Sequence, residues 1–163
     1  MTTAFLLVTL ACIFALYMAW NIGANDVANS MAPSIGSGVV SLKKAIWIAA
    51  IAEFAGAILV GSSVTSTIRK GIVDPAIFAG NPEEFMLGMT AALLGAALWL
   101  HAATLLGLPV STTHSIVGAV IGFGLVAKGA GSLNYGTLFS IVMSWAVSPV
   151  SGGILGFGIF YFV

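Results

Sequence analysis

Charged side chains are scarce in this sequence of 163 residues. Five are basic and five are acidic, which is 6% of the chain, whereas a soluble domain usually carries about a quarter. Hydrophobic residues make up 60%, and the mean hydropathy is +1.12. Such a chain cannot cover a folded surface with groups that water solvates. We therefore predict an all-α integral membrane protein, because helices satisfy their own backbone groups in lipid.

Cysteine and clustered basic residues are also nearly absent. Cys12 is the only cysteine, so an intrachain disulfide and a thiolate metal cage are both excluded. The net charge is zero, and no run of Lys or Arg alternates with aromatic residues, so we expect no nucleic-acid partner. The sequence predicts no organic cofactor.

Long apolar runs are abundant. A helix that crosses the hydrocarbon needs about 20 mostly apolar residues, and the fourth of five such runs, with about 13, suits a broken or re-entrant helix better than a full span. We predict about four to five transmembrane helices in a single domain, 1–163. The five runs are 4–20, 45–61, 85–106, 115–127 and 135–163.

The first polar interruption is the sequence NIGANDVANSMAP at 21–33, directly after the first apolar run. Asn21, Asn25 and Asn29 recur every four residues, so a helix would place them on one face. Asp26 stands among them, and an acid at membrane depth is costly unless it has a partner or a function. Amide and carboxylate oxygens suit hard cations, and we expect the backbone to unwind near Gly23 and Pro33. This pattern favours a cation site over a simple helix cap facing interfacial water.

The second interruption is GLPVSTTHS at 107–115. A proline ends one helix, and Ser111, Thr112 and Thr113 follow where the next helix should begin, the N-cap position. The start of a helix offers unpaired N–H groups and the positive end of a dipole, which together attract anions. Three hydroxyl donors there predict an oxyanion site without arginine, although an ordinary cap would use the same residue types.

Three further polar residues lie within or beside the apolar runs. Glu53 lies in the middle of the second run, and we interpret it as a cation ligand or proton carrier rather than a structural acid. His114 follows the hydroxyl residues and could titrate near neutral pH, or could be structural. We expect His101 to be a packed or hydrogen-bonded residue without a functional role.

Together, the two motifs resemble the two signature stretches of the inorganic phosphate transporter (PiT) family. Shorter stretches support the resemblance, which extends from about residue 15 to 155: EFAGA at 53–57, TIRKGI at 67–72 and SWAVSP at 144–149.

The resemblance implies symport of inorganic phosphate with Na⁺ or H⁺. It implies that Asp26, Ser111, Thr112 and Thr113 bind phosphate. It also implies a cation site, for Na⁺ if the coupling ion is sodium, formed by Asn25, Asp26, Asn29 and Glu53. Asn21 and His114 are possible additions. The expected location is the plasma (inner) membrane, and a permease for sulfate or another oxyanion stays open.

Members of this family contain two such halves in inverted orientation, with the site between them, whereas this chain has one copy of each motif. We therefore expect one half of an inverted-repeat transporter. Its partner would be a missing half of a longer protein, which the apolar ending at 158–163 favours. The alternative is a second copy of this chain inserted in the opposite direction.

Two other classes of function are weaker interpretations. An intramembrane hydrolase could use Ser111 and His114, which are three residues apart, but the sequence provides no third orienting group and no nucleophile elbow. A membrane scaffold subunit without transport activity would leave the intramembrane acids Asp26 and Glu53 unexplained.

Overall fold

The computed structural model describes residues 3–162, apart from the side chains of residues 3, 69 and 70. Its compact units are Met1–Leu133 and Asn134–Val163. The elements of the first unit are α1 (Thr3–Gly36), α2 (Leu42–Gly71), η1 (Pro75–Phe78), α3 (Pro82–Leu105), α4 (Thr112–Lys128) and η2 (Ala130–Ser132). The second unit holds α5 (Tyr135–Phe162).

Four of these helices are long and apolar enough to cross a membrane, namely α1, α2, α3 and α5. The remaining α-helix, α4, has only 17 residues, in agreement with the short element that the sequence predicted. No strand occurs among the described residues beyond an isolated bridge between Val73 and Leu133. The prediction of an all-α membrane protein is confirmed.

One prediction about the first helix is wrong. The sequence suggested that the backbone unwinds near Gly23 and Pro33, but α1 runs through both residues for 34 residues. A glycine inside a helix costs only about 1 kcal/mol. Pro33 lies in the last turn of α1, where the loss of one N–H group disrupts little of the helix. The asparagine motif is therefore presented on a helical face rather than on an open loop.

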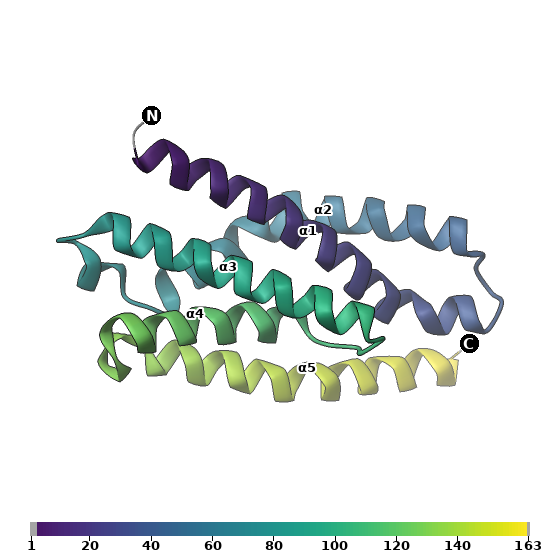
Figure 1. Ribbon diagram of the computed structural model, residues 1–163. Helices are drawn as coiled ribbons and strands as arrows, with labels where there is room; N and C mark the ends of the chain where they lie inside the picture. The colour runs from purple at the N-terminus through teal and green to yellow at the C-terminus, as the bar shows by residue number, and fades with distance from the viewer. Residues whose placement is uncertain (1–2, 163) are drawn as a thin grey trace. The chain divides into compact units, whose positions relative to one another are not determined.

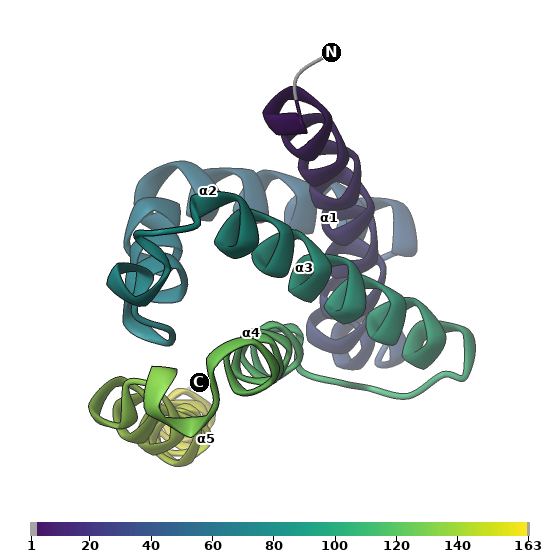
Figure 2. The same ribbon diagram turned by 60° about the vertical axis from the view of Figure 1, so that its left-hand side comes forward.

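The third helix, α3, packs against both α1 and α4 (Figure 1, Figure 2). Its contact with α1 is built on small residues, since Met18 of α1 is buried with Ala96, Ala97 and Leu100 of α3. Small side chains let two helices approach closely in lipid, where van der Waals packing drives association. Gly88 allows the same approach toward α4, because a Cβ atom there would stand 1.9 Å from the Phe123 ring.

The loops after α2 and α4 are joined into one cap, formed by residues 72–81 and 129–133. The amide of Asp74 donates to the Ser132 carbonyl (3.2 Å), and the Ser132 hydroxyl donates to the Gly124 carbonyl (3.0 Å). Phe78 is buried against the Phe85 and Phe123 rings. The cap thus fastens the C-terminal end of α4.

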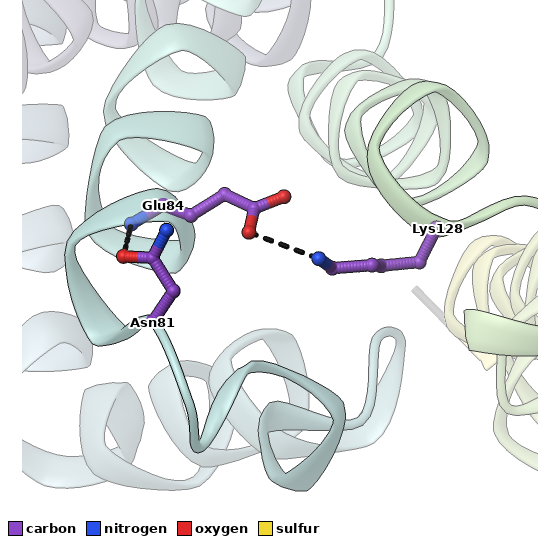
Figure 3. A network of polar contacts seen from close by, with 3 residues as sticks. All are labelled: Asn81, Glu84 and Lys128. Carbon is purple, nitrogen blue, oxygen red and sulfur yellow. Dashed lines mark hydrogen bonds and ion pairs between the residues drawn. The ribbon is translucent and has the colours of Figure 1, made fainter.

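An ion pair reinforces this end of α4. Lys128 Nζ lies 2.9 Å from Glu84 Oε2, and the Glu84 amide donates to the N-cap residue Asn81 (3.3 Å) (Figure 3). Lys128 also lies over the Phe78 ring, 5.1 Å from its centroid. The start of α3 and the end of α4 are therefore linked by charge as well as by packing.

Candidate functional site

The asparagine motif forms a ladder on one face of α1, as the spacing predicted. Asn21 and Asn25 are almost completely buried, with 1% and 4% of their surface exposed, whereas Asn29 is exposed. Asn29 Nδ2 donates to Asn25 Oδ1 at 2.8 Å. Two of the three amides thus lie inside the helix bundle, and the third faces outward.

Partners for the buried amides come from α3 and the loop after it. Asn25 Nδ2 donates to Thr104 Oγ1 (3.2 Å), with the Leu108 carbonyl at 3.4 Å. Asn21 Oδ1 lies 3.2 Å from Nδ1 of His101. These side chains are about 80 residues apart in sequence, so the tertiary structure alone reveals that they meet.

The two polar motifs are joined directly by one hydrogen bond. The Thr112 hydroxyl, in the first turn of α4, donates to Asp26 Oδ2 at 2.9 Å. Asp26 and Thr112 are both half-buried. Hydrogen bonds to an ionised carboxylate are stronger than those between neutral groups. The acid of the first motif is therefore held at the N-terminus of α4.

Ser111 is the N-cap of α4. Its hydroxyl oxygen accepts a hydrogen bond from the His114 amide (3.3 Å), and its carbonyl accepts the Ser115 amide (3.1 Å). The amides of Thr112 and Thr113 precede this first helical bond, at positions that have no acceptor within a helix. The helix start offers N–H donors and hydroxyl groups together.

Two cavities border these residues from different sides. One, of about 470 Å³, is lined by Asn25, Asn29, Thr104 and the loop at Gly107 to Pro109. The other, of about 260 Å³, is lined by Thr112, Thr113 and apolar neighbours that include Ile22. Asn25 and Asn29 thus face a cavity that Asp26 does not line, although the three residues are adjacent in the sequence.

The remaining predicted residues, Glu53, Thr113 and His114, are exposed. Glu53 lies on an exposed face of α2 and makes no hydrogen bond or ion pair within the described part of the chain. Thr113 and His114 are exposed at the start of α4. A site that uses all the predicted residues is therefore not enclosed by these helices.

Sequence reasoning missed the two side chains of α3 that bond to the buried asparagines, His101 and Thr104. We interpreted His101 as packed or hydrogen-bonded, which the contact with Asn21 confirms, but we did not connect it with the asparagine motif. The available signal was spacing: His101 and Thr104 are three residues apart in an apolar helix and so share one face.

The comparisons with known proteins decide the family. The model of the "Phosphate transporter family" matches residues 22–163. The chain belongs to the phosphate transporter family. It is 51% identical over 151 residues to a Pyrococcus abyssi protein named as a phosphate permease, which covers 93% of this chain and 37% of that protein. It is 47% identical to the chloroplastic inorganic phosphate transporter 2-1 of Arabidopsis thaliana, over 89% of this chain and 25% of that protein.

A solved structure described as the sodium-dependent phosphate transporter has the same fold. The TM-score is 0.89 at 47% identity, over 96% of this chain and 39% of that one. The chain thus spans less than half the length of these phosphate transporter relatives.

Proposed function

We propose that this chain forms one half of a sodium-coupled phosphate transporter. The observation that carries the proposal is the hydrogen bond from Thr112 to Asp26, which brings an acid to the N-terminus of α4. The helix start attracts an oxyanion through its N–H groups and dipole. Ser111, Thr112 and Thr113 add hydroxyl donors around the same position.

Asp26 gives a physical reason for coupling. A phosphate bound at the start of α4 would lie near this carboxylate, and two like charges 4 Å apart repel by about 4 kcal/mol at an effective dielectric constant of 20. A cation bound beside Asp26 would convert that repulsion into attraction. Phosphate would then bind well only with its cation.

Sodium is the cation that the similarity to a sodium-dependent phosphate transporter favours. Asn29, exposed beside Asp26 on α1, is proposed to supply an amide oxygen, and Asn25 to support it. Glu53 is proposed to contribute its carboxylate from α2. These are hard oxygen donors of the kind that alkali and alkaline-earth cations prefer.

A second, inverted half is proposed to complete the site. Asn29, Ser111, Thr113 and Glu53 are exposed on these helices, and polar groups that face hydrocarbon are costly. In many transporters the site lies between two inverted repeats, with helix ends directed at it. The partner half is either another segment of a longer protein or a second copy of this chain. The proposed location of the assembled transporter is the plasma (inner) membrane.

Uptake of radiolabelled phosphate into proteoliposomes tests the proposal. We expect uptake driven by an inward sodium gradient, little uptake with a proton gradient alone, and weak competition by sulfate. Uptake driven equally well by protons would contradict sodium coupling, and strong inhibition by sulfate would contradict the choice of phosphate. Absence of phosphate uptake under every gradient would overturn the function itself.

A further inference from the structure

His101 lies on α3 and contacts the one asparagine of the ladder that borders neither cavity. Asn21 is 1% exposed, and both ends of its amide are engaged. Nδ2 donates to the Tyr17 carbonyl at 2.8 Å, so the atom that faces His101 is Oδ1, which can only accept. Nδ1 of His101 must therefore carry a hydrogen and donate it across 3.2 Å. The contact fixes the direction of both side chains.

Thr104, one turn further along α3, fixes the next amide. Its hydroxyl hydrogen is donated to the Leu100 carbonyl (2.8 Å), so its oxygen accepts from Asn25 Nδ2. Asn25 Oδ1 then accepts from Asn29 Nδ2. The amide oxygen left without a partner within the described residues is Oδ1 of Asn29. The direction of the whole ladder is set from α3.

The apolar part of the α1–α3 contact is supplemented by hydrogen bonds. Met18 of α1 packs against Ala96, Ala97 and Leu100 of α3, and such packing depends less on the direction of each group than a hydrogen bond does. Hydrogen bonds depend on direction, and at low dielectric a buried polar group without a partner is costly. The His101–Asn21 contact therefore acts together with the Asn25–Thr104 and Thr112–Asp26 hydrogen bonds to select one rotation of α1.

We propose that His101 is a positioning residue for sodium binding. By donating to Asn21, it adds to the hydrogen bonds of Thr104 and Thr112 in holding α1 in the rotation that directs Asp26 to the start of α4 and leaves the Asn29 oxygen free for a cation. His101 itself touches neither sodium nor phosphate. This inference rests on the proposed function.

The replacements His101→Leu, His101→Asn and His101→Gln separate this role from packing. Leucine removes the donor. Asparagine places an amide nitrogen where Nδ1 stands, whereas glutamine places its nitrogen one bond further out. Leu98→Ala, at an exposed position of the same helix, is the control. Two quantities are measured: the sodium concentration at half-maximal phosphate uptake, and the sodium concentration at half-maximal thermal stabilisation of the purified protein.

We expect His101→Leu to raise both half-maximal sodium concentrations about tenfold, the effect of one interhelical hydrogen bond. His101→Asn should restore most of the sodium affinity. His101→Gln should bind sodium as weakly as His101→Leu, whereas the control Leu98→Ala should bind it as well as the wild type. The double variant His101→Leu/Asn21→Leu should be no worse than either single variant, because both remove one contact.

A purely structural role would lower the thermal midpoint and leave both half-maximal sodium concentrations unchanged, and that result would overturn the inference. Additive effects in the double variant, or equal rescue by glutamine and asparagine, would overturn it as well. If the wild-type protein shows neither sodium-dependent uptake nor stabilisation, the proposed function fails first and the role of His101 falls with it. If the wild-type protein responds to sodium and only the His101 variants are defective, the proposed function stands and the result tests the role of His101 alone.

Discussion

The two ends of α4 are built in opposite ways. The C-terminal end is fastened: Ser132 is 2% exposed and bonds to the Gly124 carbonyl, and Lys128 pairs with Glu84 (Figure 3). At the N-terminal end, Ser111 and Thr113 are exposed, and Thr112 reaches across to Asp26. One helix thus combines a packed anchor with a polar tip.

This difference indicates how a short helix can serve a binding site. Fixing one end restricts where the other end can lie, so the donors at the tip are positioned without being consumed by packing. Residues at the tip should affect ligand binding, and residues at the anchor should affect stability. The following variants test that division, beginning with the largest expected effect.

The acid at the tip should matter most for binding. Asp26→Asn keeps an oxygen but removes the charge, and opposite unit charges 4 Å apart attract by about 1 kcal/mol in water and about 4 kcal/mol at an effective dielectric constant of 20. We expect sodium affinity to fall by roughly 10- to 100-fold, as measured by the sodium dependence of phosphate uptake. Asp74→Asn, in the cap at the other end of α4, is the matched control. Unchanged sodium dependence in the Asp26 variant would remove Asp26 from the cation site.

At the anchor, Gly124→Ala should destabilise the protein. An added Cβ atom would stand 2.8 Å from Val73 and 2.9 Å from Leu133, and overpacking of this kind costs about 1–3 kcal/mol. The loss should appear as a lower thermal midpoint in detergent, with the half-maximal sodium concentration little changed. Gly122→Ala is the control, because a Cβ atom there meets nothing within 4 Å. Equal midpoints for the two variants would show that the anchor is not tightly packed.

Thr112→Val removes the hydroxyl at the tip and preserves the side-chain volume. We expect phosphate affinity to weaken by about 1–2 kcal/mol, because a charged acceptor loses one donor. Equilibrium binding of phosphate to the purified protein measures the change. Thr9→Val removes a hydroxyl that bonds only to the backbone of its own helix (2.8 Å to the Phe5 carbonyl) and should bind phosphate normally. Equal affinity in both variants would contradict a role for Thr112 in the oxyanion site.

The ion pair at the anchor should have the smallest effect. Lys128 and Glu84 are 32% and 33% exposed, so solvent screens the pair, and Glu84→Gln should cost less than about 1 kcal/mol. The thermal midpoint should fall slightly at low salt, and the difference should vanish at high salt. Glu83→Gln, in the same helical turn, controls for the helix dipole. A loss that persists in high salt would mean that the contact is more than an exposed ion pair.

How much of this could be predicted depended on the distance between the interacting residues. The helices followed from apolar runs, and the N-cap at Ser111 followed from Pro109 and the three hydroxyl residues, because these are local patterns. The boundaries were less accurate, since α1 continues through Gly23 to Gly36 where the first apolar run ended at Trp20. Polar side chains can extend a helix when another helix supplies their partners.

By itself, the sequence determined that the chain lies in lipid, that its fold is helical, and where its two polar motifs are. Scarcity of charge and spacing along a helix are properties of the chain alone. Only the tertiary structure decided that Thr112 bonds to Asp26, that His101 meets Asn21, and that Glu53 bonds to neither pair. The physical reason is that hydrogen bonds and packing act over a few ångströms. Residues about 80 positions apart come within that range only when the helices have packed.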